Sequence, residues 1–514
     1  MRFNFTLNRL SLLCFIPLFL RHSIAVDILK AGQSFHDTQI IVSADQKFEL
    51  GFFTHPKSSN FKYLGIWYKS LPDYVVWVAN RDNPILNSSA TLKFNTNGNL
   101  VLVNQTGQVF WSSNSKSLQD PIAKLLDTGN IVLRDSTSRS EDYVWQSFDY
   151  PSDTLLPGMK LGWDSKSGLN RKLISRKSQN DLSSGEFSYE VNLDGLAELV
   201  VRKGNKTMFR GGPWFGDGFT RGRSNGGIFI YNSSFEISFS YNIPTNDPYK
   251  VVLDSSGSVI HSVWNQEENG WRTTYTFEGS GCNDYDLCGN FGLCSSVLLA
   301  SCGCLDGFKQ KSAQNSSDGC VRKDDKICRE GEGFRKISDV KWPDSTWNLV
   351  KLKVGIKNCE TECLNDCSCL AYGILSLPNI GVACVTWFDK LLDIRYVRDV
   401  GTGDDLFLRV AASELERSER KSIIVPVVVP IISVLILLAL ISFYIIRRVR
   451  RRAEVSADNG VTITEDLIHE NELEMPMAII EAATNNFLIS NKIGEGGFGP
   501  VYKMTEDVLY SIGK

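Results

Sequence analysis

Four residues near the C-terminus have the spacing of a phosphate-binding loop. Gly494, Gly496 and Gly499 form a Gly-x-Gly-x-x-Gly string, and Val501 follows two residues later. Glycines at these positions let backbone N–H groups approach nucleotide phosphates, because no side chain stands in the way. Phosphoryl transfer also needs a strand lysine, its glutamate partner, a catalytic aspartate and Mg²⁺ ligands. The sequence reaches Lys514 soon after Gly499, so we expect no catalytic residue. We would expect ATP and Mg²⁺ as cofactors only if the catalytic domain were complete.

Other side chains with catalytic or metal-binding chemistry are sparse. A nucleophile-elbow string surrounds Ser224, but it lacks the preceding strand and following helix that such a serine needs. A carbohydrate-active enzyme would need paired carboxylates in a cleft, which is a property of the fold and not of the sequence. A zinc site or a histidine base needs clustered histidines, whereas the five histidines are widely separated: His22, His36, His55, His261 and His469. We expect no metal site.

The cysteines favour a different chemistry. Of 13 cysteines, Cys14 lies near the N-terminus and the other 12 lie between positions 282 and 384. An even number confined to one segment is typical of disulfides in an oxidising compartment, with zinc binding as the competing interpretation. Glycosylation sequons of the Asn-x-Ser/Thr type also precede residue 423. They are Asn87, Asn104, Asn205, Asn232 and Asn315.

Two apolar segments predict the topology. Residues 1–25 combine early arginines, an apolar run and small residues at positions −3 and −1, which indicates a secretory signal peptide. The stretch from Ile423 to Ile446 contains no charged residue and is long enough for one transmembrane helix. Five arginines between positions 447 and 452 favour a cytoplasmic location for residues 447–514. We therefore expect a single-pass type I protein of the plasma membrane with an extracellular N-terminus.

Length and composition exclude several classes. A chain of 514 residues is long enough for three or four domains. Its apolar fraction of 42% and charged fraction of 22% fit neither a disordered nor a polytopic membrane protein. The net charge of −3 supplies no basic field for nucleic acid. We expect no nucleic-acid partner.

A tryptophan repeat predicts the fold of the N-terminal part. Trp77, Trp111 and Trp145 are separated by two equal steps along the chain, and each lies in a strand-like stretch. Some helical repeats share this period, but the intervening segments are short strands with Gly or Asn turns, such as GNLVLV at 98–103 and GNIVLR at 129–134. We predict a three-fold β-prism.

The strings WVANRDNPI, LLDTGNIVL and VWQSFDYPSDTLLPGMKLG resemble the bulb-type mannose-lectin domain of plant G-type lectin, S-domain receptor-like serine/threonine kinases. The resemblance places this domain at residues 26–155 and implies a Gln-x-Asp-x-Asn-x-Val-x-Tyr sugar pocket. Asn99 and Val101 match one copy, and Asn130 and Val132 match another. The Gln, Asp and Tyr positions hold Asn95, Asn97 and Val103, or Leu126, Thr128 and Arg134. A pocket without these polar groups discriminates poorly, so turn and core roles are the alternative.

The next segments resemble further modules of the same family. FRGGPWFGDG, within residues 156–278, resembles the S-locus glycoprotein domain. The close pair Cys302 and Cys304 followed by LDGF makes residues 279–321 resemble an EGF-like module. That resemblance implies three disulfides, which in a module of this size replace a missing hydrophobic core. The implied pairs are Cys282 with Cys294, Cys288 with Cys302, and Cys304 with Cys320.

Residues 328–411 resemble a PAN/apple domain. Four-residue steps place Cys359, Cys363 and Cys367 on one stripe of a predicted helix, from which they should bridge to a sheet. The resemblance suggests the pairs Cys359 with Cys384 and Cys363 with Cys369. Cys328 and Cys367 are left over, and their pairing stays open.

The cytoplasmic segment AIIEAATNNFLISNKIGEGGFGPVYK resembles the start of a receptor-like kinase domain, and the sequence departs from that family at Met504. We read the glycine loop as a relic. The predicted fold is mainly β and multidomain, with a lectin prism, a β-rich S-locus domain, an EGF-like module, an α+β PAN/apple domain, one transmembrane helix and a short stub.

The family resemblance leads to a functional hypothesis. The chain is a cell-surface receptor-like binding protein of the pollen-recognition or defence type without a functional kinase. The alternative is a truncated product or gene model of a receptor-like serine/threonine kinase. Expected partners are an unidentified extracellular peptide, protein or glycan, and full-length S-domain receptor kinases.

Overall fold

The computed structural model describes only part of the chain, in two compact units, residues 1–423 and residues 424–514. The predicted signal peptide and Ser224 lie outside the described residues. The described residues are 27–56, 58–138, 143–215, 227–232, 235–242, 247–296, 301–324, 328, 330–344, 348–352, 356–377, 381–397, 403–415, 433–448, 477–497 and 499–503.

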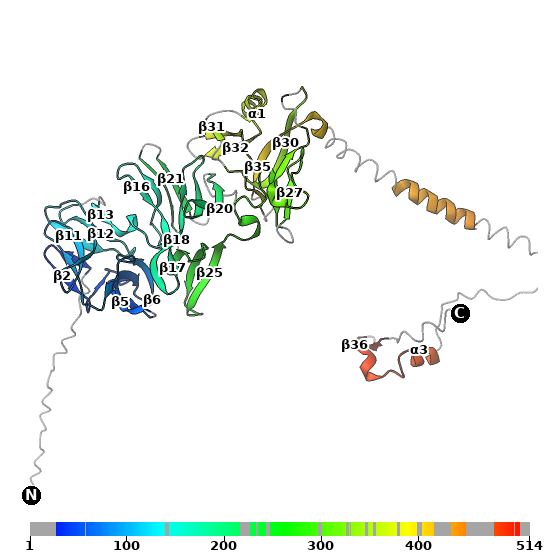
Figure 1. Cartoon of the computed structure of the whole chain (residues 1–514). Helices are drawn as coiled ribbons and strands as arrows, with labels where there is room; N and C mark the ends of the chain where they lie inside the picture. The colour runs from blue at the N-terminus through cyan, green and yellow to red at the C-terminus, as the bar shows by residue number, and fades with distance from the viewer. Residues whose placement is uncertain are drawn as a thin grey trace, which may run out of the picture. The chain divides into compact units, whose positions relative to one another are not determined.

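Three antiparallel sheets form the N-terminal part of the first unit, coloured blue to cyan in Figure 1. The first has the order β3 (Ile40–Val42), β4 (Phe48–His55), β5 (Ser58–Tyr68) and β6 (Leu71–Val78), with β7 (Ile85–Leu86) beside β5. The second has the order β10 (Val109–Ser112), β9 (Leu100–Asn104), β8 (Ala90–Phe94) and β2 (Ser34–His36). The third has the order β1 (Ile28–Lys30), β11 (Pro121–Leu125), β12 (Ile131–Asp135) and β13 (Trp145–Gln146).

The repeated tryptophans bring the three sheets together. The ring centroids of Trp77 and Trp111 lie 6.0 Å apart, those of Trp111 and Trp145 5.7 Å apart, and those of Trp77 and Trp145 6.4 Å apart. All three pairs meet edge to face, the arrangement that aromatic quadrupoles favour. One tryptophan from each repeat therefore occupies the common axis, as their equal spacing in the sequence predicts for a three-fold prism.

Three further four-stranded antiparallel sheets follow. The first is β14 (Thr154–Leu155), β23 (Tyr249–Leu253), β24 (Val259–Asn265) and β25 (Gly270–Phe277). The second is β16 (Leu169–Arg171), β15 (Leu161–Asp164), β22 (Glu236–Tyr241) and β21 (Gly227–Asn232). The third is β17 (Leu173–Ser178), β18 (Asp181–Asn192), β19 (Glu198–Lys203) and β20 (Lys206–Pro213).

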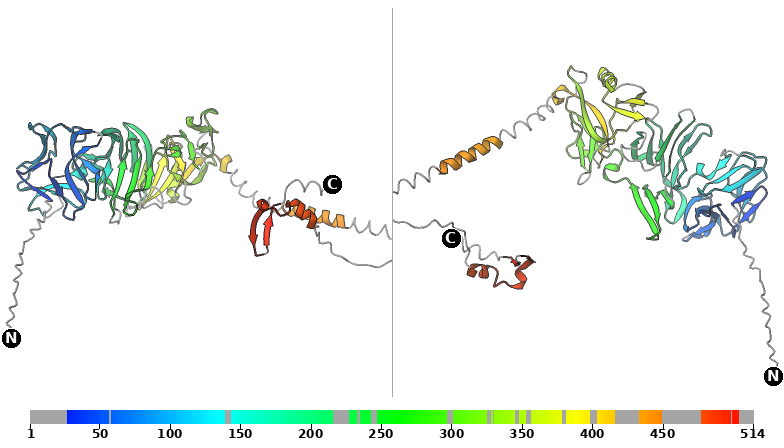
Figure 2. Two further views of the ribbon diagram at one scale, coloured as in Figure 1. Left: turned by 90° about the horizontal axis from the view of Figure 1, so that it is seen from below. Right: turned by 180° about the vertical axis from the view of Figure 1, so that it is seen from behind.

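One buried apolar cluster runs through the prism and these sheets, from Leu29 in β1 to Val259 in β24. The boundary predicted between residues 155 and 156 therefore does not divide two separate cores. Burial of a large apolar side chain contributes about 1.5–3 kcal/mol, so a shared core couples the two expected domains in stability. In Figures 1 and 2 the strands follow one another in colour order, from blue at the prism to yellow.

The cysteine-rich part is built around one eight-stranded sheet. Because β26 pairs in parallel with β34, the expected EGF-like and PAN/apple modules share this sheet. Its order is β27 (Ser301–Cys304), β26 (Gly292–Ser295), β34 (Ile394–Tyr396), β30 (Gly333–Lys341), β35 (Asp404–Val410), β32 (Ala371–Leu377), β33 (Gly381–Trp387) and β31 (Asn348–Leu352). A separate hairpin joins β28 (Phe308–Gln310) to β29 (Cys320–Arg322).

The helix of this part is α1 (Ile356–Asn365). It is shorter than the cysteine spacing suggests, because Asp366 starts a turn in which its carbonyl accepts from the Cys369 N–H at 3.0 Å. The prediction that Cys367 shares a helical stripe with Cys359 and Cys363 is therefore wrong for Cys367, which lies beyond the helix.

The second unit contains few described elements. Residues 433–448 are helical, followed by α3 (Met477–Ala483) and a hairpin of β36 (Lys492–Gly496) and β37 (Gly499–Tyr502). The first part of the predicted membrane span, residues 423–432, lies outside the described residues. Among the residues that are described, no helix has both the length and the apolar character that crossing a membrane requires.

Candidate functional site

The predicted sugar residue Asn99 is held inside its own repeat. It follows Gly98, whose φ of +86° closes a turn that a side chain would strain. The Asn99 Oδ1 accepts from the Ser113 hydroxyl at 2.7 Å, and its Nδ2 donates to Ser112 Oγ at 2.9 Å. The Ser113 hydroxyl oxygen in turn accepts from the Leu100 N–H at 3.0 Å. The amide therefore ties the turn to β10.

Asn130 repeats this arrangement and is only 5% exposed. Its Oδ1 accepts from the Ser147 hydroxyl at 3.1 Å and from the Phe148 N–H at 3.2 Å. Its Nδ2 donates to Gln146 Oε1 at 2.9 Å. Both asparagines are thus paired with a serine two residues after a repeated tryptophan. This Trp-x-Ser signal is visible in the sequence beside the tryptophan spacing.

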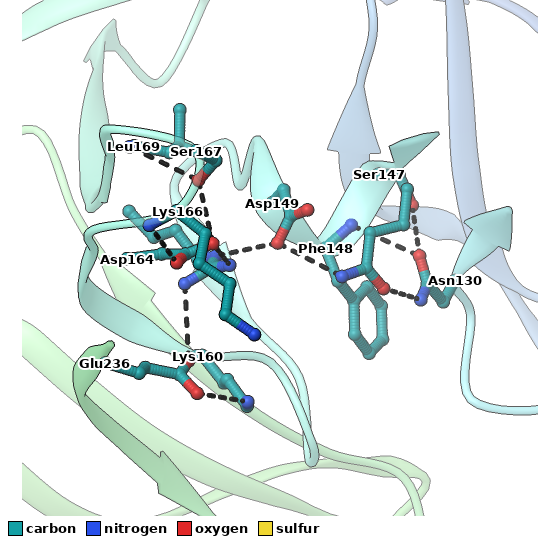
Figure 3. A network of polar contacts seen from close by, with 12 residues as sticks. Asn130, Ser147, Phe148, Asp149, Lys160, Asp164, Lys166, Ser167, Leu169 and Glu236 are labelled. Carbon is teal, nitrogen blue, oxygen red and sulfur yellow. Dashed lines mark hydrogen bonds and ion pairs between the residues drawn. The ribbon is translucent and has the colours of Figure 1, made fainter. Parts of the chain in front are cut away.

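The contacts of Asn130 continue into the neighbouring sheets (Figure 3). Gln146 Nε2 donates to Asp149 Oδ1 at 3.1 Å, and the same oxygen accepts from Arg171 Nε at 2.6 Å. Arg171 NH1 reaches Glu236 at 3.4 Å, and Glu236 pairs with Lys160 at 3.0 Å. A polar chain therefore links the predicted sugar site to β16 and β22, which supports a structural role for Asn130.

The two valines of the matched pockets differ in exposure. Val132 is fully buried, at 0% exposure, so no sugar ring can pack on it. Val101 is half-buried. An open hollow of about 450 Å³ does lie beside the first copy, but its wall is formed by residues 32–34 and 93–97. It includes Asn95 and Asn97, from the expected Gln and Asp positions, and not Asn99 or Val101.

Six disulfides occur among the described residues. The EGF-like part holds Cys282–Cys294, Cys288–Cys302 and Cys304–Cys320. The PAN/apple part holds Cys359–Cys384, which joins α1 to β33, together with Cys363–Cys369 and Cys328–Cys367. Five of these are the pairs that the family resemblance implies, and the sixth joins the two cysteines left over.

These bonds also bear on metal binding. The sulfur atoms of Cys288, Cys294 and Cys302 lie within 4.8 Å of one another, close enough to resemble a metal site. Each is bonded to another cysteine. Because a zinc ligand must be a free thiolate, these three residues do not fit a metal ion.

A buried cluster of charged groups joins β19 and β20 to the eight-stranded sheet. Arg210 is 1% exposed and donates to Asp393 Oδ2 at 2.8 Å and to Glu198 Oε2 at 2.9 Å. Lys341, also 1% exposed, pairs with the same Asp393 oxygen at 2.5 Å. Burial lowers the pKa of Lys341 and raises the pKa of Glu198, because both lose water. We call these four residues the Lys341 cluster.

One carboxyl group beside the Lys341 cluster is incompletely paired. The Oδ1 atom of Asp286 is buried and has no hydrogen-bond partner among the described residues. Burial raises the pKa of Asp286 to about 6, and the negative charges of Asp393 and Asp344 add to this shift. No sequence motif marks the cluster, since Glu198 and Arg210 come from the neighbouring strands β19 and β20 while Lys341 and Asp393 come from distant segments.

The glycines of the loop lie in the β36–β37 hairpin, with Gly494 and Gly496 in β36 and Gly499 in β37. Gly494, Gly496 and Gly499 are open on the side where a Cβ atom would lie, with no described atom within 4 Å. Val501 is 58% exposed. The interpretation of this loop as a relic that binds no nucleotide remains a prediction.

The sequons are mostly accessible. Asn87, Asn205 and Asn315 are exposed, and Asn104 is half-buried. Asn232 ends β21, and its side chain lies outside the described part of the chain.

Family models match three stretches of the chain. A D-mannose binding lectin model matches residues 74–177, an S-locus glycoprotein domain model matches residues 209–312, and a PAN-like domain model matches residues 328–394. These lie within the prism and its neighbouring sheets, across the sheets that follow, and in the eight-stranded sheet. The snowdrop (Galanthus nivalis) mannose-specific agglutinin is a solved structure with 20% identity and a TM-score of 0.17, and the match covers 22% of this chain and 94% of that one.

Curated relatives resemble almost the whole chain. Receptor-like serine/threonine-protein kinase SD1-7 of Arabidopsis thaliana is 38% identical over 95% of this chain, which spans 61% of that relative's length. S-locus-specific glycoprotein S6 of Brassica oleracea is 37% identical over 80% of this chain and 97% of its own. The putative inactive G-type lectin S-receptor-like kinase SRK of Arabidopsis thaliana is 35% identical over 95% of both. The chain belongs to the family of S-locus glycoproteins and G-type lectin S-receptor-like serine/threonine-protein kinases.

Proposed function

We propose that the chain is a single-pass cell-surface protein that binds an extracellular glycan or protein ligand through its S-domain ectodomain. The main support for an extracellular location is the set of disulfides. Twelve cysteines are paired in six bonds, and such bonds persist in oxidising compartments. The similarity to S-locus glycoproteins and receptor-like kinases supports the same placement. The apolar stretch from Ile423 to Ile446 is the proposed membrane anchor.

Topology can be tested on intact cells that express the chain. Protease added outside should remove epitopes inserted in the prism and leave an epitope at Lys514 intact. Glycosidase should lower the apparent mass, and replacing exposed sequon residues such as Asn205 with Gln should reduce that shift. An internal location of the prism epitope would contradict the proposal.

A separate proposal concerns kinase activity of residues 1–514. Residues 1–514 contain the glycine loop but no HRD or DFG segment, and the relative SD1-7 is longer than this chain. We expect the purified chain of residues 1–514 to transfer no phosphate and to show no ATP-dependent thermal shift. Autophosphorylation above a vector control would favour the alternative, a serine/threonine kinase activity.

Mannose is not the ligand that the lectin repeats favour. Asn130 is buried and bonded, and Val132 is inaccessible. We expect mannose to bind no tighter than about 1 mM, or about −4 kcal/mol. Micromolar binding by calorimetry that Asn99→Ala abolishes would contradict this expectation. Association with full-length S-domain receptors in the same membrane, where confinement raises the effective concentration, is a further proposal that co-precipitation tests.

A further inference from the structure

A second hollow lies where the prism meets the sheets that follow it, and its wall includes residues of β6, β17 and β23. Its volume is about 260 Å³. Tyr74 in β6, Arg176 in β17, and Lys250 and Val252 in β23 form much of its wall. Two regions distant in sequence therefore create this space, which we call the Lys250 hollow.

The ammonium group of Lys250 is a positive charge in the wall that has no carboxylate ion-pair partner among the described residues. Its Nζ lies 4.0 Å from the ring centroid of Trp271 and 4.7 Å from that of Tyr74. Among the described residues no carboxylate pairs with this ammonium, since the hollow's ion pair joins Arg176 to Asp153. Burial lowers the pKa of Lys250 to about 8; repulsion by Arg176 adds to the effect, and the negative charge of Asp153 opposes it. The ammonium is thus partly desolvated and only weakly compensated by ring faces.

The carboxylates around Lys250 are mostly committed elsewhere. Asp153 accepts from Arg176 and from the Thr154 hydroxyl. Asp254 Oδ1 accepts backbone N–H groups of its own turn, at 2.8 and 2.9 Å. Asp73 is exposed at the rim, where water screens its charge. An incoming anion would therefore meet a cation that forms no ion pair with a described carboxylate, although Asp153 lies close enough to act on its charge.

The remaining wall favours a polar ligand of modest size. Ser178, Gln179 and Ser255 supply hydroxyl and amide groups. The volume lies below the about 300–1,000 Å³ usual for sites of drug-sized ligands. The hollow has space for one ring, side chains that can bind hydroxyl groups, and the ammonium of Lys250. These features together match a sugar that carries a carboxylate.

We propose that the Lys250 hollow binds one hexuronic acid residue of a glycan, with its carboxylate on Lys250 and its hydroxyls on Ser178, Gln179 and Ser255. The proposal rests on the extracellular ligand-binding role proposed above and names the class of ligand. It concerns a surface distinct from the Asn99 and Asn130 repeats.

Calorimetry of the purified full chain with short oligogalacturonates tests the proposal. We expect Lys250→Met, which keeps the apolar stem, to weaken binding at least about 10-fold, and Val252→Trp to weaken it by filling the hollow. The matched control Lys93→Met changes an exposed lysine in the other hollow and should leave binding unchanged. Affinity for the wild type should fall as the pH rises through about 8, because Lys250 loses its charge, and Lys250→Met should abolish this dependence.

Three results would overturn the proposal. They are equal binding by wild type and Lys250→Met, equal affinity for a neutral oligogalactose, and equal affinity for inorganic phosphate. The last would make the hollow a general anion site. Because binding is measured on purified protein, a negative result refutes this inference alone, whereas failure of the epitope-protection experiment refutes the cell-surface proposal alone.

Discussion

Lys250 and Lys341 are two lysines in opposite situations, since Lys250 is half-buried and Lys341 is buried. Lys341 is 1% exposed and pairs with Asp393, which also holds Arg210. Lys250 faces a hollow and contacts the rings of Tyr74 and Trp271. Burial lowers the pKa of both.

The difference separates a structural charge from a candidate binding charge. Burying an ion costs several kcal/mol unless partners compensate it. In the Lys341 cluster the partner is part of the fold, whereas in the Lys250 hollow the aromatic faces compensate only in part. A low pKa alone therefore does not identify a binding site. The decisive property is whether a carboxylate within the fold pairs with the charge.

The largest effect is expected for Asp393→Asn. This change leaves Lys341 and Arg210 without their shared carboxylate, which should destabilise the fold by about 3–5 kcal/mol. Asparagine tolerates the positive φ of 61° at this position, so backbone strain does not explain the loss. Thermal and urea unfolding midpoints measure it.

The matched control is Asp405→Asn, which breaks the exposed pair with Lys336 at 2.8 Å. Such surface pairs contribute about 0–1 kcal/mol. Similar losses in both variants would show that the Lys341 cluster is not held by its charges.

Asn130→Ala extends the comparison to a neutral group whose hydrogen bonds are all made within the fold. Removing the amide leaves the Ser147 hydroxyl and the Phe148 N–H buried without their acceptor, at a cost of about 1–3 kcal/mol. Asn99→Ala should cost less, since Asn99 is itself half-buried and one of its two serine partners, Ser112, can reach water, whereas the other, Ser113, is buried. A larger loss for Asn99→Ala in the same unfolding measurement would contradict the structural role assigned to Asn130.

Asp286 provides a pH-dependent test beside the Lys341 cluster. Its pKa is raised from 3.8 to about 6 in the fold, so the folded state favours the protonated form. Its stabilising contribution is present below pH 3.8 and is lost as the pH rises through about 6. Asp286→Asn should therefore stabilise the chain at pH 7 by about 1 kcal/mol, a value reduced for solvent screening.

Unfolding midpoints of the two proteins at pH 4 and pH 7 check this sign. The stabilisation by Asp286→Asn should be present at pH 7 and nearly absent at pH 4. The reverse order would mean that the carboxylate is stabilised by the neighbouring cations.

The smallest stability effect is expected for Lys250→Met. The variant loses the contacts of the ammonium with the two rings, which are worth about 0.5–2 kcal/mol. It also avoids the cost of desolvating a charge, because methionine is neutral. The unfolding free energy should therefore change by less than about 1 kcal/mol. A destabilisation as large as that of Asp393→Asn would show that Lys250 is a structural residue like Lys341, and would contradict its assignment as a binding residue.

Local patterns made much of this structure predictable. The spacing of Trp77, Trp111 and Trp145 predicts the three sheets because each repeat places one ring at a common axis. Five of the six disulfide pairs are those that the family resemblance implies, whereas it leaves the pairing of Cys328 with Cys367 open. The end of α1 was missed because the turn at Asp366 interrupts an otherwise regular cysteine period.

The Lys250 hollow and the Lys341 cluster were not predictable in the same way. Tyr74 and Lys250 meet only because β6 and β23 belong to sheets that share one core. Arg210 and Asp393 lie far apart in the sequence yet share a hydrogen bond, and neither belongs to a local motif. Pairings of this kind depend on tertiary packing, which strand periodicity does not encode.

We propose that the ligand binds this chain at Lys250 and not at the asparagines of the lectin repeats. A crystal structure of the chain grown with both mannose and an oligogalacturonate tests it most directly. The account predicts a uronate carboxylate within hydrogen-bond distance of Lys250 Nζ, with Asn99 still bonded to Ser113. Mannose seated on Asn99 and Val101, with the Lys250 hollow empty of sugar, would contradict it.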